Sequence, residues 1–318
     1  MTYTKNFPIE FKPVADPNAV IKDLNVRFTV LTSQLLRLEY SPNGRFEDRP
    51  SQPFWYRQQP VPAFETRHEG VGLVIETADL ILRYQPEDAG FTPDSLSIEL
   101  KETGLRYQYG DANPDNLQGT ARTVDDVDGA VQLEAGLLSR SGWALVDDSE
   151  TLVFNDEGWL ELREAAEGAL DLYFFGYGHN YQQCLHDYQL LTGKAPLLPR
   201  WVLGNWWSRF WAYSDKELLG LMDEFRTNGV PLSVCIVDID WHLRETGNQS
   251  TGWTGYTWNR ALFPDPAGFI GKLHERGLKT GFNLHPAEGI HAHEEQYEAM
   301  AIHMGIDPKT KEPVEFDC

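Results

Sequence analysis

The first half of the chain alternates between short apolar runs and turn-forming residues, and it shows no long helical pattern before about residue 175. Turn signals such as SPNG (41–44) and NDEG (155–158) separate these runs. Short strands bounded by tight turns are typical of an antiparallel β-sandwich. The runs expected to form its strands are Val26–Tyr40, Val71–Tyr84, Ser95–Leu100, Val131–Leu138, Trp143–Val146, Leu152–Phe154 and Ala169–Phe175.

The periodicity changes near residue 180. Asn180–Leu191 carries apolar residues on one helical face, and Gly193, Pro196 and Pro199 then mark a break. We therefore expect a sandwich domain over residues 1–195, with a linking helix near 180–192, and a second domain over 196–318. The second domain is expected to run Trp201–Trp207 (strand), Ser214–Thr227 (helix), Ser233–Asp240 (strand), Pro266–Arg276 (helix), Leu278–Leu284 (strand) and His293–Met304 (helix). This alternation predicts a parallel sheet with crossover helices.

The second domain holds about three strand–helix units, whereas a (β/α)8 barrel needs about 250 residues. Residues 313–318, PVEFDC, look like the approach to a fourth strand. The expected architecture is therefore a β-sandwich followed by the first part of a (β/α)8 TIM barrel, truncated after about three units. We expect the chain to be a fragment of a longer protein.

Composition and charge narrow the possible partners. A formal net charge of −21 repels phosphate backbones and argues against a general nucleic-acid binder. The N-terminus, MTYTKNFPIEFKP, lacks the apolar stretch of a signal peptide, and no run approaches the roughly 20 apolar residues of a membrane span. Cys184, Cys235 and Cys318 show no metal or redox spacing, which suits a reducing compartment. We expect a cytoplasmic protein without a membrane partner.

The stretch most informative about chemistry is Pro231–His242, PLSVCIVDIDWH, where an apolar run ends abruptly in Asp238 and Asp240. Charge at the edge of a core is unfavourable unless a partner or ligand compensates it. Ligands bind at the carboxyl ends of parallel strands. The spacing of two residues would put both carboxylates on one strand face, where they could accept hydrogen bonds from substrate hydroxyls. The structural alternative is that one of them caps a helix or pairs with Arg244.

Aromatic and polar residues gather at the other expected strand ends. Phe210 and Trp211 follow the first strand of the second domain, and the loop 252–259 after DIDWH carries two Trp and one Tyr. Asn283 and His285 follow the third strand with the same spacing as the two aspartates. Convergent polar and aromatic groups on neighbouring strand ends predict one pocket. Flat aromatic faces there could stack on sugar rings or could simply pack the loops.

Two patterns could be interpreted as metal sites. His291 and His293, with Glu294, Glu298 and His303, contain an H-x-H, but at an expected helix start residues two apart do not share a face. A solvated helix N-terminus is therefore favoured there, and no metal site is predicted. The D-x-D at 238–240 could instead hold a divalent metal and a sugar nucleotide, as in some glycosyltransferases. The chain shows no basic or Gly-rich loop that would cradle a diphosphate.

Several stretches, taken together and in order, resemble glycoside hydrolase family 31, the family of α-glucosidases, α-xylosidases and related retaining enzymes. These stretches are Arg27–Gln52, Asn116–Ala130, Leu137–Ser149, Tyr173–Arg209, Val237–His242 and Phe263–Pro286. The resemblance implies an N-terminal β-sandwich on a (β/α)8 barrel and the retaining hydrolysis of α-glycosidic bonds by two carboxyl groups. In this family both carboxyl groups are aspartates on later strands, so the nucleophile and the acid/base are expected beyond Cys318.

The resemblance also implies a carbohydrate partner, no metal and no organic cofactor. The isolated chain is expected to be inactive, because it lacks both catalytic aspartates. The positions carried over as substrate-binding are Asp238, which matches the family's hydroxyl-binding aspartate, the adjacent Asp240 and Trp241, the aromatic Phe210 and Trp211, and Asn283 and His285 on the third strand.

The motifs NLHP and DIDWH and the loop Gly252–Asn259 depart from the patterns of the well-known α-glucosidases. The sugar therefore stays open among glucose, xylose, galactose and N-acetylated sugars. Three alternatives also remain: a metal-dependent glycosyltransferase using Asp238 and Asp240, a non-catalytic carbohydrate-binding protein, and one half of a split hydrolase whose second chain supplies the later strands. An oligomer is possible.

Overall fold

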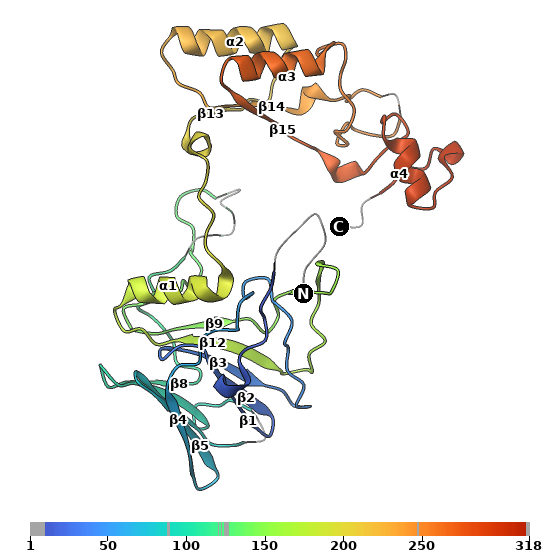
Figure 1. Cartoon of the computed structure of the whole chain (residues 1–318). Helices are drawn as coiled ribbons and strands as arrows, with labels where there is room; N and C mark the ends of the chain where they lie inside the picture. Colours follow the sequence, from blue (N-terminus) through green and yellow to red (C-terminus); the bar gives the residue numbers. More distant parts are fainter. Residues whose placement is uncertain are drawn as a thin grey trace. The chain divides into compact units, whose positions relative to one another are not determined.

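The computed structural model describes residues 10–87, 90–119, 121, 123, 127–246 and 248–315. The chain divides into two compact units, Met1–Ala195 and Pro196–Cys318, and each is described here by itself. The first unit runs from blue to yellow-green in Figure 1 and the second from yellow to red. Within the described ranges, no helix has both the length and the apolar character needed to cross a membrane.

The first unit is a sandwich of two antiparallel five-stranded sheets. One sheet has the order β1 (Val20–Asp23), β2 (Val26–Val30), β3 (Leu35–Tyr40), β12 (Leu170–Phe175) and β9 (Ala144–Asp147). The other has the order β4 (Phe64–Glu69), β5 (Gly72–Thr77), β6 (Leu80–Tyr84), β7 (Leu96–Leu100) and β8 (Leu105–Gln108). A small hairpin joins β10 (Val153–Phe154) and β11 (Leu160–Glu161), and a 3-10 turn, η1 (Pro17–Ala19), precedes β1.

Apolar side chains from both sheets meet in one core. Phe28 and Leu38 come from the first sheet, and Ile75, Leu82 and Ile98 come from the second; all are nearly inaccessible to solvent. Burying each such side chain contributes roughly 1.5–3 kcal/mol, so alternate residues along the strands fix the register.

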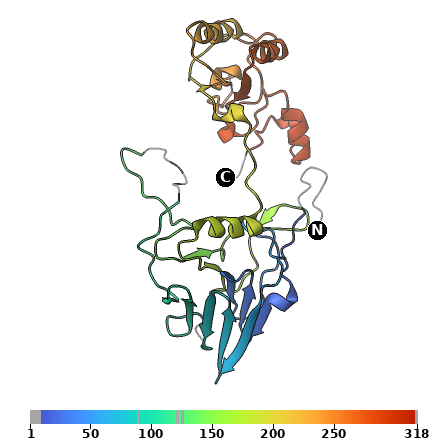
Figure 2. The same cartoon turned by 60° about the vertical axis from the view of Figure 1, so that its left-hand side comes forward.

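Helix α1 (Tyr181–Thr192) covers the opposite face of the first sheet, as the two views in Figures 1 and 2 show. Its Cys184, Tyr188 and Leu191 pack with Phe54 and Phe175 beneath it. Asn180 caps its first turn by accepting a hydrogen bond from the backbone of Gln183. The helix therefore belongs to the sandwich unit, and the three central strands of the sheet, β2, β3 and β12, are buried on both faces.

The expected strand Val131–Leu138 is wrong, because residues 131–138 form an irregular segment. Its alternating Val131 and Leu133 remain more than a third exposed and have no neighbouring strand to cover them. Strands β1, β4, β8 and β11 were missed. The sequence of β4, FETRHE, is almost wholly exposed, and such an edge strand carries little apolar pattern.

The second unit contains the parallel sheet β13 (Trp206–Trp207), β14 (Val234–Val237) and β15 (Lys279–Phe282), in that order. Helices α2 (Asp215–Thr227) and α3 (Pro266–Glu275) connect the strands and lie beside one another in both views. Their Leu218, Met222, Phe269 and Leu273 share a core with Val237. The remaining elements are α4 (Tyr297–His303) and the 3-10 turns η2 (Arg200–Leu203), η3 (Ile239–Trp241), η4 (Pro286–Glu288) and η5 (Pro308–Thr310).

Four expected elements in this unit differ from the structure by two or more residues at one end, and one of them, the strand 278–284, spans only Lys279–Phe282. The first three residues of the expected strand at 201–207 belong to the turn η2, in which Leu203 is exposed, and only its last two residues pair with β14. The expected strand 233–240 ends at Val237, where η3 begins to form. The expected helix 293–304 starts at Tyr297. The approach to a fourth strand lies partly outside the described residues, since Phe316, Asp317 and Cys318 are not among them.

Candidate functional site

The carboxyl ends of β14 and β15 are tied together through Asp238. Its side chain caps η3 by accepting a hydrogen bond from the Ile239 backbone at 2.8 Å. The same oxygen, Oδ1, accepts a second hydrogen bond from Nδ2 of Asn283 at 2.9 Å. Among the described residues, none donates a hydrogen bond to the other oxygen, Oδ2. Asp238 is therefore oriented by one oxygen and keeps an acceptor for a ligand.

The two aspartates do not share a strand face, because η3 turns the chain directly after Asp238. Asp240 instead pairs with the Arg244 guanidinium, with Nη1 3.2 Å from Oδ1. The guanidinium of Arg244 also lies 5.9 Å from the centre of the Phe210 ring. Both structural roles foreseen for this motif are thus present: Asp238 caps a turn and Asp240 forms an ion pair.

Trp241 lies in the core behind the site. Its side chain is buried, its Nε1 donates to the Asn283 carbonyl at 2.9 Å, and its ring packs edge-to-face with Trp258 and Phe282. Such a side chain fixes the relative position of η3 and β15. Its indole hydrogen bond is already used, which leaves it a supporting role beneath the site.

Phe210 and Trp211 follow β13, and these residues are 66% and 54% exposed to solvent. The Arg209 guanidinium lies 4.4 Å from the centre of the Trp211 ring, within the range of a cation–π contact. Single exposed aromatic residues are ordinary on protein surfaces, but two adjacent ones after a sheet strand form an apolar surface on which a sugar ring could stack.

His285 brings a ring nitrogen close to Asp238, with its Nε2 4.0 Å from Oδ1. Its Nδ1 lies 3.2 Å from Nε2 of His242, a side chain that is completely buried. The Trp253 ring packs edge-to-face against His285 at 4.8 Å. The sequence analysis considered Trp253 as one of the loop aromatics that could contact a sugar, but it missed His242, which directly follows the DIDW motif and could have been noticed there.

The loop that carries Trp253 is fastened to the segment after β15. Ser250 Oγ and the Thr251 backbone each donate to Glu288 Oε2 at 2.8 Å, and the Thr251 hydroxyl donates to Oε1. Although burial alone would raise it, these hydrogen bonds from Thr251 and Ser250 lower the pKa of Glu288. Thr254 likewise donates to the buried Glu294. These carboxylates hold the aromatic loop over His285.

The expected solvated helix N-terminus at His291 and His293 is wrong. His293 is only 13% exposed, its Nε2 lies 3.1 Å from Oε1 of Glu294, and the Glu294 side chain is almost fully buried. Burial lowers the pKa of His293. The described residues contain no group of three or more His, Cys, Asp or Glu side chains placed to hold a metal ion.

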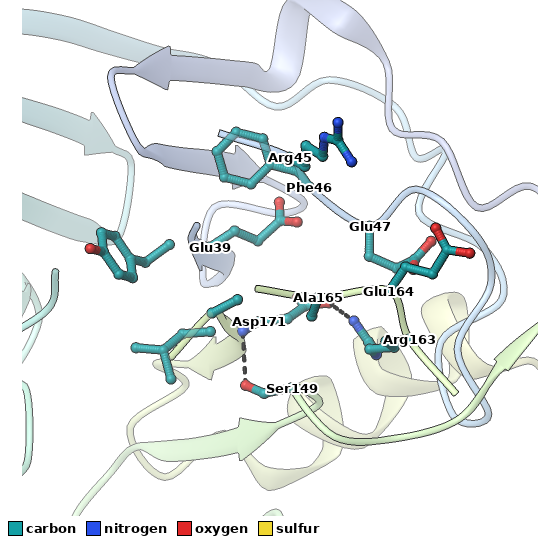
Figure 3. A pocket seen from close by; sticks show the side chains of 12 residues that line it. Glu39, Arg45, Phe46, Glu47, Ser149, Arg163, Glu164, Ala165 and Asp171 are labelled. Atoms are coloured by element: carbon teal, nitrogen blue, oxygen red, sulfur yellow. Dashed lines mark hydrogen bonds and ion pairs between the residues drawn. The ribbon is translucent and has the colours of Figure 1, made fainter. Parts of the chain in front are cut away.

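The sandwich unit holds a separate polar cavity of about 60 Å³, drawn in Figure 3. Two buried carboxylates, Glu39 and Asp171, line it, and the Asp171 backbone donates to Ser149 at 2.9 Å. Glu39 is held by Arg27 at 2.6 Å, and Asp171 is bound by Arg37 at 2.7 Å.

The buried carboxylates and guanidinium groups around this cavity pair largely with one another. Arg163 pairs with Asp171 at 2.8 Å and with Asp148 at 2.6 Å. Although burial opposes it, Arg37 lowers the pKa of Asp171, whereas burial raises the pKa of Glu39. Removing one member of such a buried network leaves an uncompensated charge, which costs several kcal/mol. We interpret the cluster as an internal cross-link between β2, β3 and β12.

The second unit matches a known family model. Residues 195–312 match the Glycosyl hydrolases family 31 TIM-barrel domain. An α-xylosidase of Emericella nidulans is 27% identical over 216 residues, which cover 64% of this chain and 26% of that protein. An α-xylosidase of Saccharolobus solfataricus is 32% identical over 117 residues, which cover 37% of this chain and 15% of that protein. The chain thus spans about a quarter or less of the length of these curated relatives.

Solved structures share the fold. The GH31 α-xylosidase of Xanthomonas citri aligns with a TM-score of 0.60 at 13% identity, over 85% of this chain and 49% of that one. A mutant GH31 dextranase of Flavobacterium johnsoniae complexed with isomaltotriose aligns with a TM-score of 0.60 at 15% identity, over 88% of this chain and 38% of that one. These likenesses fit an N-terminal β-sandwich followed by part of a TIM barrel. Residues 195–312 thus match the TIM-barrel domain of glycoside hydrolase family 31, and the longer chain is similar to α-xylosidases in sequence and to family 31 structures in fold.

Proposed function

We propose that this chain supplies the substrate-binding part of a retaining glycosidase that hydrolyses α-glycosidic bonds. The observation that carries the proposal is the arrangement of Asp238. Its Oδ1 is held by Ile239 and Asn283, while its Oδ2 and the nearby Nε2 of His285 stay open to a ligand. Ionised carboxylates accept strong hydrogen bonds from hydroxyl groups, which are the recognisable feature of a sugar.

The relatives support the same class of substrate. Family 31 relatives include α-xylosidases and α-glucosidases, and a solved relative is complexed with isomaltotriose. We assign Asp238 and His285 to hydroxyl binding, Phe210 and Trp211 to a stacking surface, and Asn283 to the orientation of Asp238. The proposal gives this chain no catalytic carboxylate.

The geometry is less favourable to a metal-dependent glycosyltransferase. A D-x-D metal site needs both carboxylates to converge on one ion. Here Oδ1 of Asp240 is engaged by Arg244, and η3 separates the two side chains. A metal would have to replace the guanidinium of Arg244 and refold this turn.

The test combines binding and turnover. Binding of methyl α-D-xyloside and methyl α-D-glucoside to the 318-residue chain is measured by calorimetry, and release of p-nitrophenol from the matching α-glycosides is measured with the natural protein. Asp238→Asn is expected to lower kcat/KM roughly 30- to 1,000-fold, because hydroxyl contacts strengthen in the transition state. This decrease corresponds to a loss of about 2–4 kcal/mol of transition-state stabilisation.

The matched control is Glu275→Gln, which removes one negative charge from the exposed surface of α3 and should leave both measurements unchanged. Unaltered kcat/KM in Asp238→Asn would remove this residue from the site. Sugar binding without release of p-nitrophenol by the natural protein would favour a non-catalytic carbohydrate-binding protein instead.

A further inference from the structure

The completely buried His242 fixes where protons lie at the candidate site. Its Nδ1 is 3.0 Å from the backbone carbonyl of Leu243. A carbonyl oxygen only accepts hydrogen bonds, so Nδ1 of His242 must carry a proton. A neutral imidazole has a single N–H group, and the other nitrogen is then an acceptor.

His242 is held neutral by its surroundings. Burial lowers the pKa of His242; the charges of His285 and Arg244 act in the same direction, while the Leu243 carbonyl and Glu294 oppose them. Its Nε2 is therefore an acceptor, and among the residues that the structure describes only Nδ1 of His285, at 3.2 Å, lies within hydrogen-bond distance of it. For this contact to be a hydrogen bond, Nδ1 of His285 must donate.

We propose that His242 is a positioning residue that keeps a proton on Nδ1 of His285, so that Nε2 of His285 faces Asp238 as a bare acceptor whenever His285 is neutral. The consequence for substrate binding rests on the function proposed above. Free imidazole side chains favour the opposite tautomer, with the proton on Nε2. In that tautomer His285 would point a donor at the Asp238 carboxylate 4.0 Å away and compete with the ligand for it.

The surrounding loop packs closely against His285 and restricts movement of its ring away from His242. Gly255 has a left-handed backbone, with φ +71°, and an added Cβ would lie 2.8 Å from the backbone nitrogen of His285 and 3.4 Å from the His242 ring. The Trp253 ring also packs edge-to-face against the His285 ring. The two acceptors, Nε2 of His285 and Oδ2 of Asp238, thus stand ready for a ligand that offers two hydroxyl donors.

The test reads the tautomer directly and needs no substrate. The full 318-residue chain is labelled with ¹⁵N-histidine, and long-range ¹⁵N–¹H spectra are recorded at pH 8, with signals assigned through His285→Gln and His242→Gln. In the unmodified chain we expect a protonated Nδ1 and a bare Nε2 in both His242 and His285. Finding His285 with its proton on Nε2 would overturn the proposal.

Two substitutions of His242 distinguish the effect of its acceptor atom, Nε2, from the effect of the size of its ring. His242→Phe removes the acceptor and should shift His285 to the Nε2–H tautomer. In His242→Gln, the side-chain carbonyl can take the place of Nε2, so His285 should keep its proton on Nδ1. His303→Gln, a change on the exposed surface of α4, should alter nothing. An unchanged tautomer in folded His242→Phe would refute the role of His242.

Sugar binding is then measured separately on the same variants. Methyl α-D-xyloside should bind His242→Phe about tenfold more weakly than the unmodified chain, the order expected when one hydrogen bond to a charged or buried group is lost. Because the tautomer is read without sugar, failure of the binding experiment in every variant would count against the proposed function alone. Equal binding by the Phe and Gln variants would count against the positioning role alone.

Discussion

At the scale of single residues, the site depends on groups that are already partly engaged. Asp238 uses one oxygen to cap η3 and hold Asn283, and Asp240 is committed to Arg244. Structural roles and the proposed ligand-binding role of Asp238 therefore fall on the same side chain. A carboxylate oriented in this way loses little freedom when a ligand arrives, which is how preorganisation improves binding.

The buried histidines predict an acid-sensitive second unit. Burial lowers the pKa of both His242 and His293, so between that lowered value and the ordinary value near 6.5 the unfolded chain binds more protons than the folded one. Stability is then fully present above about pH 6.5 and is lost as the pH falls, at up to about 1.4 kcal/mol per pH unit for each histidine.

Urea unfolding of the chain at pH 7.5 and 5.5 measures this dependence. His242→Gln should flatten it, because glutamine does not titrate. His274→Gln, on the exposed surface of α3, should leave it as steep as in the unmodified chain. An equal slope in the His242 variant would mean that His242 is already charged or free to reach water when the chain is folded.

At the scale of elements, the sequence predicted the start of a helix correctly where a side chain caps its first turn. Ser214 and Glu217 form the expected capping box of α2: the Glu217 backbone donates to Ser214 Oγ at 3.3 Å, and the Ser214 backbone donates to Glu217 Oε2 at 2.9 Å. By contrast, the end of β14 and the start of α4 were misplaced, since each depends on contacts with distant residues.

Ser214→Ala should destabilise the second unit by about 1 kcal/mol, because the Glu217 backbone N–H at the start of α2 loses its acceptor, Ser214 Oγ. The effect is measured as a lower urea midpoint at constant slope. Ser208→Ala makes the same chemical change in an exposed loop and should cost less than about 0.5 kcal/mol. Equal midpoints for the two variants would show that the cap contributes nothing to the folded unit.

At the scale of the whole molecule, the chain consists of two compact units joined near residue 195. Leu197 is fully exposed, and the residues from Lys194 to Arg200 are all open to solvent. Exposed segments that make few contacts are preferred sites of proteolysis. The sandwich has its own core, and the second unit has its own apolar cluster around α2 and α3.

Brief treatment with trypsin should therefore cut after Lys194 or Arg200 first and yield two fragments that resist further cleavage, as observed by mass spectrometry. Lys194→Gln combined with Arg200→Gln should remove this early cleavage. The control, Lys272→Gln on the exposed surface of the helix α3, should leave it unchanged. Early cuts within the sandwich strands would contradict the division into two units.

Much of the fold could be predicted because local sequence encodes it. Short alternating or apolar runs between turn signals located β2, β3, β5, β6, β7 and β12, and the change of period placed the helices α1, α2 and α3. Exposed edge strands such as β4 were missed, because a strand that buries few side chains carries no apolar alternation. The candidate site was predicted from polar residues at strand ends, and the parallel order β13-β14-β15 brings these ends to one edge of the sheet.

The sequence by itself determined the apolar periodicity, the turn and cap signals, and the position of Asp238 after a buried strand. These features act over a few residues, where backbone preference and side-chain burial decide the outcome. Only the tertiary structure decided that η3 turns Asp240 toward Arg244 and that His242 meets His285, 43 positions later in the chain. Such contacts arise when β14 and β15 pair and bury their ends, because no local preference specifies which distant side chain completes a hydrogen bond.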